Sequence, residues 1–340
     1  MARIQKLRKA IVAVAAIGLA VSLVSCSSGS SSPGTSGNSE DQAPIKVTLG
    51  LPVQATTLAP VYLATQEKIW QKYGLDVKVI TFSGDAPLVK ALASGDLDIV
   101  VSSLTGAMNL EQAGQDVQVV FGGFNQTAFA WYAPESIKNI KDGKDKKWGI
   151  TSFGSSTDLL TRYAVARSGL DPDKDIKYIK GGASAARLAA MKAGQIDVNI
   201  FTPPYYTRAE AQGYHKILDL GDLVDQYPMH LVYGMADHLN KNPEMVQRVV
   251  DAISDACQQT KDDPDTAAKA LAADNKISVT EAKASIESWI DQLYPDGRLV
   301  DDSSLEAFWK MGMDGKLFKS EIPKSKWFTT KYIDNISIKK

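Results

Sequence analysis

Short apolar segments alternate with amphipathic segments along most of the chain after residue 44. The short segments are rich in β-branched residues, which favours strands, and the amphipathic ones have helical spacing. Gly74, Gly95 and Gly169 stand where predicted helices end, and Asp85 is predicted to cap the helix that follows it. The expected strands are residues 45–51, 76–82, 97–101, 117–121, 147–151, 176–179, 196–201 and 216–218, with helices between them.

This order predicts an α/β fold with mostly parallel strands and helices on both faces of each sheet. The order also repeats along the chain. Residues 91–98 (ALASGDLD) align with residues 190–197 (AMKAGQID) at an offset of 99, and both end a helix, turn at a glycine and start a strand. We therefore expect two similar lobes with a cleft between them, joined by chain crossings near residues 129–134 and 226–233.

The chain is mainly helical from about residue 243 to its end, and we expect this tail to pack back on the first lobe. The first lobe is predicted to comprise residues 45–130 with 231–340, and the second lobe residues 131–230. Helical spacing and capping residues place tail helices at residues 244–261, 264–273, 280–293 and 303–314.

The N-terminal segment has the pattern of an export signal. Residues 1–25 contain four cations and no anion, and an apolar run spans residues 10–23, which is too short to cross a membrane. The run ends in Leu-Val-Ser followed by Cys26, which resembles the bacterial lipoprotein box. That resemblance implies cleavage before Cys26 and a lipid on its sulfur. Residues 26–44, rich in serine and glycine, are predicted to form a flexible tether.

Charge and composition narrow the classes of partner. Without residues 1–25, the chain has 34 Lys and Arg against 39 Asp and Glu, so nucleic acid is not an expected partner. Two cysteines and three histidines make a Cys/His zinc site unexpected, and we predict neither metal nor cofactor. Cys257 lies at helical apolar spacing and is predicted to be a buried, inert thiol.

The loops after the strands are the candidate binding site, because ligands of open α/β sheets bind beyond the carboxyl ends of the strands. The sequence Gly154-Ser155-Ser156-Thr157 leads directly into a helix. It can cap that helix, and its free N–H groups can also seat an anion. Near these loops gather aromatic residues that can form an apolar slot: Phe124, Trp131, Phe153, Phe201, Tyr205 and Tyr206.

Three cations of the second lobe, Arg162, Arg187 and Arg208, can pair with an anionic ligand, but their helical positions favour a solvated face. Catalytic motifs are absent: the sequence has no Gly-x-Ser-x-Gly elbow and no phosphate-binding loop. No base and nucleophile are paired on the strand-end loops, so we do not expect an enzyme. Asp98 and Asp197, at matching strand starts, are predicted to cap local backbone.

Several segments together resemble the solute-binding lipoproteins of ABC importers, in particular the nitrate, sulfonate and taurine branch that includes binders of thiamine pyrimidine precursors. They are residues 58–64 (LAPVYLA), 72–77 (KYGLDV), 91–98, 154–157, 168–171 (SGLD) and 190–197. The resemblance implies a two-lobed periplasmic-binding fold of type II, each lobe a mixed sheet flanked by helices, with a hinge that closes on ligand. It also implies a permease and an ATPase on other chains, and a monomeric protein lipid-anchored outside the cytoplasm.

By the same resemblance, ligand contacts fall on the strand-end loops, to which the aromatic Trp131 is added. The implied contacts are Gln54, Ala55, Thr56, Thr57, Ser83, Gly84, Ser102, Ser103, Thr105, Gly154, Ser155, Ser156, Thr157, Phe201, Thr202 and Pro203. The main hypothesis is a small organic anion of the sulfonate, nitrate or taurine type. The alternatives are a neutral aromatic heterocycle such as a pyrimidine precursor, an exported enzyme using the same cleft, and a sensing domain. The cysteine-rich motif of related pyrimidine-synthesising proteins is missing.

Overall fold

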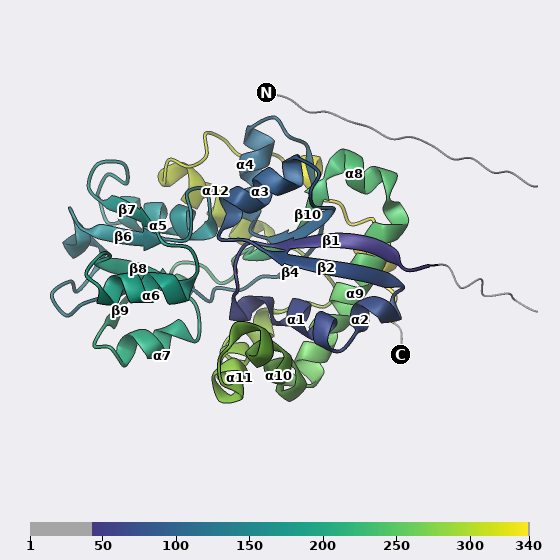
Figure 1. Cartoon of the computed structure of the whole chain (residues 1–340). Helices are drawn as coiled ribbons and strands as arrows, with labels where there is room; N and C mark the ends of the chain where they lie inside the picture. Colours follow the sequence, from purple (N-terminus) through teal and green to yellow (C-terminus); the bar gives the residue numbers. More distant parts are fainter. Residues whose placement is uncertain (1–42, 339–340) are drawn as a thin grey trace, which may run out of the picture. The chain divides into compact units, whose positions relative to one another are not determined.

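The computed structural model describes residues 43–338, and its strands form two five-stranded sheets (Figure 1). The first sheet has the order β2-β1-β3-β10-β4. Strand β1 is parallel to β2 and β3, whereas β10 is antiparallel to both of its neighbours. The strands are β1 (Ile45–Leu51), β2 (Leu75–Thr81), β3 (Ile99–Ser102), β4 (Val117–Phe124) and β10 (His230–Met235).

The second sheet repeats this topology with the order β7-β6-β8-β5-β9, and β5 is its antiparallel member. Its strands are β5 (Ala130–Ala133), β6 (Lys147–Ile150), β7 (Lys177–Lys180), β8 (Val198–Phe201) and β9 (His215–Asp219). Strands β5 and β10 lie where the sequence predicted only crossings. All four residues of β5 are buried, so this strand has no alternating pattern to reveal it.

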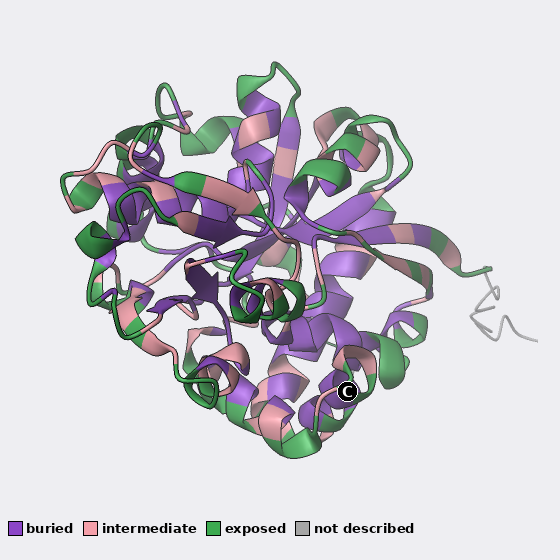
Figure 2. Ribbon diagram, turned by 60° about the vertical axis from the view of Figure 1, so that its left-hand side comes forward, coloured by how far each residue is buried: buried purple, intermediate pink, exposed green. Residues whose placement is uncertain are grey.

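Helices cover both faces of the first sheet because its strands send alternate side chains to opposite sides. In β3, Ile99 and Val101 join the core under α1, α2, α9 and α10, whereas Val100 joins the core under α3 and α4. Figure 2 shows the strands as mostly buried and the outer surfaces of the helices as exposed. These helices are α1 (Ala59–Gln66), α2 (Ile69–Lys72), α3 (Asp85–Ala93), α4 (Leu104–Gln112), α9 (Pro243–Asp262) and α10 (Pro264–Asn275).

The helical tail contacts both lobes, not only the first. Helices α9 and α10 pack against α1, but α12 packs against α5 of the second sheet. After α12 the chain returns to the first sheet, where α13 lies against β4. The remaining helices are α5 (Ser156–Arg167), α6 (Ser184–Lys192), α7 (Tyr205–Glu210), α8 (Ala236–Lys241), α11 (Val279–Glu287), α12 (Asp302–Asp314) and α13 (Lys324–Trp327).

The sequence repeat corresponds to a repeated backbone contact. The Asp98 carboxylate accepts a hydrogen bond of 2.7 Å from the N–H of Thr48, and the Asp197 carboxylate accepts one of 2.8 Å from the N–H of Lys147. In each pair the aspartate N–H donates back to the carbonyl of the same partner. The expected backbone capping by both aspartates is therefore confirmed, and it ties β1 to β3 and β6 to β8 at equivalent places.

Other expectations concern single elements. Cys257 is buried in α9, and burial raises the pKa of its thiol well above the ordinary value, which agrees with an inert side chain. No helix among residues 43–338 is long and apolar enough to cross a membrane. The predicted signal of residues 1–25, Cys26 and nearly all of the tether lie outside the described residues.

Removing the carboxylate of Asp197 tests how much this repeated backbone contact contributes to stability. We expect Asp197→Ala to lower the free energy of unfolding by about 1–3 kcal/mol, because the N–H of Lys147 loses its acceptor. Urea unfolding measures this change. Gln195→Ala, at an exposed neighbouring position, is the matched control and should change stability by less than about 0.5 kcal/mol. Equal stability of the two variants would contradict the interpretation.

Candidate functional site

A cavity of about 50 Å³ lies between the loops of the two sheets. It has room for a few water molecules or one small ligand. The first-sheet side contributes residues after β1, at the start of α3 and α4, and at the start of β10, and the second-sheet side contributes the starts of α5 and α6. The cavity is lined by Pro52, Val53, Gln54, Ala55, Thr57, Asp85, Ser103, Phe129, Thr151, Ser155, Ser156, Thr157, Ala183, Ser184, Arg187, Thr202, Met229 and His230.

Arg187 is a buried cation on this cavity. Its residue is 2% exposed, and its guanidinium donates to the Thr151 hydroxyl (2.9 Å), the Ser184 hydroxyl (3.1 Å) and the Ile200 carbonyl (2.9 Å). No carboxylate among residues 43–338 forms an ion pair with it, and its Nε atom has no partner there. Burial lowers the pKa of Arg187 to about 9, so it remains charged at neutral pH.

The sequence favoured a solvated face for Arg187, and the structure corrects this. A Cβ atom at Gly181 would lie 2.6 Å from Cγ of Arg187, so the glycine makes room for the arginine to fold inward. The other two arginines behave differently. Arg162 pairs with Asp158 and Asp173, and Arg208 pairs with Glu281.

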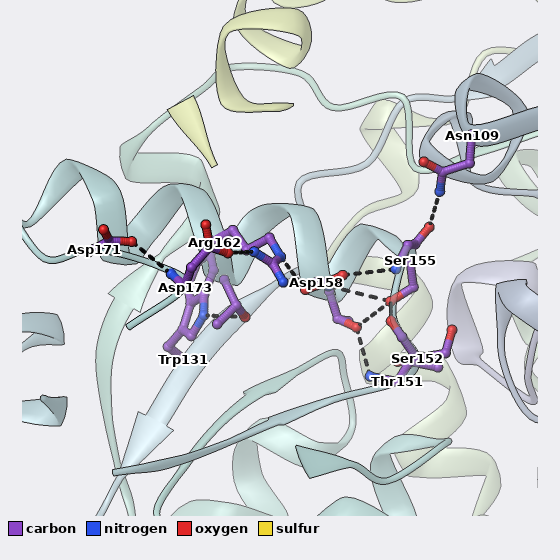
Figure 3. A network of polar contacts seen from close by, with 12 residues as sticks. Asn109, Trp131, Thr151, Ser152, Ser155, Asp158, Arg162, Asp171 and Asp173 are labelled. Atoms are coloured by element: carbon purple, nitrogen blue, oxygen red, sulfur yellow. Dashed lines mark hydrogen bonds and ion pairs between the residues drawn. The ribbon is translucent and has the colours of Figure 1, made fainter. Parts of the chain in front are cut away.

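The start of α5 forms a second polar wall of the cavity (Figure 3). Ser155 caps the helix, as predicted, by accepting from the N–H of Asp158. The Thr157 hydroxyl accepts a 2.8 Å hydrogen bond from the N–H of Thr151, which fixes the end of β6 against the helix. The N–H groups of Ser156 and Thr157 lie in the first helical turn, where no intrahelical acceptor exists, so they favour a negative charge.

An ion-pair network that runs from buried Asp158 to exposed Asp173 holds this loop in place (Figure 3). The Asp158 carboxylate accepts from the N–H of Gly154 (2.8 Å) and from Nε of Arg162 (2.9 Å). Arg162 also reaches Asp173 at 2.8 Å. Burial raises the pKa of Asp158, and the charge of Arg162 opposes that rise. The network therefore positions the loop without entering the cavity.

Asp85 faces the cavity from the first lobe. The sequence predicted a helix cap, but Gly84 occupies the cap position and Asp85 is the first residue of α3. Its carboxylate accepts from the hydroxyls of Ser102 (2.8 Å) and Ser103 (2.7 Å). Burial raises the pKa of Asp85, whereas these hydroxyls lower it. The side chain is therefore an anchored acceptor at the strand ends and not a cap of its own helix.

Thr57 and His230 form a hydroxyl–imidazole pair on the cavity wall, with 3.0 Å between Oγ1 and Nε2. The sequence showed no paired base and nucleophile, because the two residues meet only when β10 returns to the first sheet. Nδ1 of His230 has no partner among the described residues, and burial lowers the pKa of this histidine to about 3. The imidazole is thus neutral and a weak base.

Direct contacts join the lobes around the cavity. The Thr56 hydroxyl donates to the Pro203 carbonyl at 2.6 Å, and the Asn109 amide donates to the Gly154 carbonyl at 2.8 Å. Arg208 of α7 pairs with Glu281 of α11, with 2.7 Å between Nη2 and Oε1. The two lobes are therefore in direct contact around the cavity, which is a closed arrangement.

The structure brings about half of the sequence-predicted contacts together on the cavity: Gln54, Ala55, Thr57, Ser103, Ser155, Ser156, Thr157 and Thr202. The residues that it adds to that set are Pro52, Val53, Asp85, Phe129, Thr151, Ala183, Ser184, Arg187, Met229 and His230. The sequence did contain a signal for Arg187. It lies three residues after Ser184, which starts a helix at a strand-end loop, so the two side chains lie on the same face of that helix.

The other predicted contacts lie around the cavity. Thr56 and Pro203 contact each other across the lobes and line an adjoining hollow, and Gly154 contacts Asn109. Ser102 supports Asp85 from behind. The last three lie beside other residues: the Thr105 hydroxyl is 3.5 Å from the Tyr227 hydroxyl, the backbone oxygen of Ser83 lies near Gly182, and Gly84 lies near the Ser152 side chain.

The expected aromatic slot does not form. Trp131 and Phe201 are completely buried in the second sheet, because strands β5 and β8 lie in its interior. The indole N–H of Trp131 donates to the Thr161 hydroxyl at 3.2 Å. None of the six predicted aromatic residues lines the cavity, although Tyr205 lines the adjoining hollow. The aromatic rings on the cavity are those of Phe129 and His230. No group of three His, Cys, Asp or Glu side chains within residues 43–338 is placed to hold a metal ion.

Comparison with known proteins agrees with this architecture. The nitrate/nitrite binding protein NrtA of Synechococcus elongatus is 28% identical over 319 residues, covering 82% of this chain and 70% of that protein. The alkanesulfonate-binding protein SsuA of Xanthomonas axonopodis pv. citri, solved bound to MOPS, superposes with a TM-score of 0.70 at 18% identity, covering 84% of this chain and 99% of the other.

The same fold occurs in an enzyme. The desulfurization enzyme DSZB superposes with a TM-score of 0.60 at 16% identity, covering 86% of this chain and 98% of that one. At such identities the two solved structures establish the fold, which here is the two-lobed periplasmic-binding fold expected from the sequence. The family is established by a sequence model that matches residues 40–274, more than half of the chain. The protein belongs to the NMT1-like family.

Proposed function

We propose that the protein is the extracytoplasmic solute-binding component of an ABC importer and that its interlobe cavity captures a small organic anion. The observation that carries this proposal is the buried guanidinium of Arg187, which faces the cavity with no carboxylate partner in the described part of the chain. The nitrate-binding and sulfonate-binding proteins that share this fold support the same class of ligand.

Burying a cation is costly unless an opposite charge or several hydrogen bonds compensate for the lost water. Arg187 donates three hydrogen bonds to neutral groups, which leaves its charge unbalanced. An anionic ligand supplies the missing charge and an acceptor for Nε. The first turn of α5 adds unpaired N–H groups on the same lobe, so both features favour a sulfonate, carboxylate or nitrate group.

Capture is proposed to occur by hinge closure between a first lobe of residues 45–130 with 231–340 and a second lobe of residues 131–230. Because cavity residues come from both lobes, opening separates Thr57 and Asp85 from Arg187 and admits ligand. A ligand that contacts both sides stabilises the closed arrangement by its differential affinity. The permease can then distinguish the closed, loaded protein from the open one.

Delivery requires partners on other chains, which we propose to be a permease and an ATPase. Lipid on Cys26 and the tether of residues 26–44 would hold a monomeric folded body near the outer face of the membrane while it reaches the permease. This part of the proposal is testable by mass spectrometry of the N-terminal peptide from the native producer.

The proposal does not include catalysis. The Thr57–His230 pair has the atoms of a nucleophile and a base, but its imidazole is a weak base and no carboxylate orients Nδ1 among the described residues. The neutral-heterocycle alternative loses its main support because the predicted aromatic residues do not line the cavity. Release of unchanged ligand after prolonged incubation is the expected result, and turnover would overturn this reading.

Replacing the buried cation tests the anion site. Arg187→Met should weaken binding of nitrate or ethanesulfonate about 10- to 150-fold, because charge-assisted hydrogen bonds are lost. Isothermal titration calorimetry measures the affinity, and a thermal melt verifies folding. Arg167→Met is the matched control. Arg167 is the last residue of α5 and does not line the cavity, so this variant should bind the anion as tightly as the parent protein does. A folded Arg187→Met protein with unchanged affinity would refute the anion site.

The double variant Ser155→Ala with Thr157→Ala tests the wall formed by α5. Both hydroxyls hold the loop, so their removal should lower stability by about 1–2 kcal/mol and weaken anion binding about 10-fold. Asp263→Ala removes an equivalent cap from α10, away from the cavity, and should lower stability without changing anion binding. If the double variant affects stability only, the α5 terminus does not seat the anion.

The interlobe ion pair offers a test of closure. Arg208→Gln should raise the ligand dissociation rate by no more than about fivefold, because partly exposed ion pairs contribute less than about 1 kcal/mol. Stopped-flow kinetics and calorimetry measure the rate and the affinity. Slower association with unchanged dissociation would contradict a closing role for this contact.

A further inference from the structure

The hydroxyl of Thr57 contacts the imidazole of His230 on the cavity wall. Thr57 lies in the turn between β1 and α1, and His230 is the first residue of β10; both are buried and line the cavity. The distance between Oγ1 and Nε2 is 3.0 Å. Because a hydroxyl and a neutral imidazole can each donate or accept, the contact has two possible arrangements. They present opposite chemistry to a ligand.

The surroundings of His230 favour one of these arrangements. Burial lowers the pKa of His230 to about 3, so at neutral pH the ring has a single N–H. Nδ1 is buried and has no hydrogen-bond partner among residues 43–338. A proton on Nδ1 would therefore be a buried donor without an acceptor, which costs stability. A proton on Nε2 instead donates to Oγ1 of Thr57, so the ring uses its only N–H.

This tautomer makes Thr57 a donor. When its oxygen accepts from Nε2 of His230, its own proton must point to another acceptor. No second hydrogen bond of this hydroxyl occurs in the described part of the chain. Thr57 is fully buried and lines the cavity, so the cavity is where an acceptor for this proton can lie.

Neighbouring hydroxyl groups on the same side of the cavity have already used their protons. Ser103 is the other hydroxyl residue that the first sheet contributes to the cavity lining, and it donates to the Asp85 carboxyl at 2.7 Å. Thr56 donates to the Pro203 carbonyl at 2.6 Å. Of these hydroxyl groups, that of Thr57 is therefore the one that can donate to a ligand from the first-sheet side.

We propose that His230 is a positioning residue of the cavity and that its Nε2–H orients the hydroxyl of Thr57 so that Thr57 donates to the bound anion. This inference rests on the proposed anion-binding function. Arg187 and the first turn of α5 contact the anion from the second sheet, and Thr57 contacts it from the first. The pair thus stabilises the closed arrangement only when the ligand offers an acceptor to each side.

The tautomer of His230 can be observed directly. Long-range proton–nitrogen NMR of the protein labelled with ¹⁵N-histidine distinguishes a proton on Nε2 from one on Nδ1. Signals missing from His230→Gln identify this residue among the three histidines. We expect the proton on Nε2 at neutral pH, with and without nitrate. A proton on Nδ1 would overturn the proposal whether or not the protein binds anions, so this measurement is independent of the proposed function.

Calorimetric titration with nitrate and ethanesulfonate tests the contact with the ligand. Thr57→Val removes the proton and should weaken binding about tenfold or more, because a hydrogen bond to a charged group is lost. Thr57→Ser keeps the hydroxyl and should bind within about threefold of the parent. His230→Leu leaves the hydroxyl without its donor and should weaken binding about tenfold. His230→Gln places an amide N–H near the position of Nε2 and should recover affinity to within about threefold of the parent.

A double-mutant cycle separates positioning from a merely structural role. In the Thr57→Val background, His230→Leu should change the affinity less than about twofold, because the hydroxyl that His230 orients is already gone. Thermal melts verify that each variant is folded. His238→Leu is the matched control: His238 is a residue of α8 that does not line the cavity, so this variant should bind as tightly as the parent.

Two outcomes in a parent protein that binds anions would overturn the role of His230 alone. One is an equal loss of affinity from His230→Leu in both backgrounds, and the other is a folded Thr57→Val variant with the affinity of the parent. If the parent protein binds neither anion, the proposed function fails, and this inference fails with it.

Discussion

The site depends on one electrostatic constraint, the burial of the Arg187 guanidinium away from any carboxylate of the described chain. The loop glycine at position 181 leaves space for its stem, and hydroxyl and carbonyl groups from three elements accept its hydrogen bonds. These neutral partners orient the group but do not cancel its charge. The end of β6, strand β8 and helix α6 therefore fix the position of the Arg187 guanidinium, and its counter-charge must come from the cavity.

The repeated topology explains why a carboxyl group and a guanidinium line the same cavity from different lobes. Each lobe turns the same strand ends and helix starts toward the cleft, and each receives one antiparallel strand after the chain has crossed between lobes. Similar scaffolds carry different chemistry at these equivalent edges. The first lobe presents Asp85 with its two serines, and the second presents Arg187 with the start of α5. The fold brings the strand ends of the two lobes together, and a few side chains give each lobe its own chemistry at the cavity.

Much of the scaffold was predictable from local pattern, since β1 has the expected bounds and Ser155 caps α5 as predicted. The antiparallel strands β5 and β10 were not predictable, because a short strand buried on both faces has no alternation to detect. The inward direction of Arg187 and the burial of Trp131 depend on which helix or strand face meets the cleft. The Thr57–His230 contact joins residues far apart in sequence, so it too required the fold.

The path of the tail has a mechanical consequence. The chain leaves the first lobe, lays α12 along α5, and returns so that the residues after α13 pair with β4. The chain also crosses between the lobes before β5 and before β10. The path through α12 therefore connects the lobes in addition to these two crossings. Each added connection between two bodies removes some of their freedom to move relative to each other. Opening should therefore be confined to fewer directions than a hinge of two strands would allow, so that Arg187 and Asp85 separate and return along a restricted path.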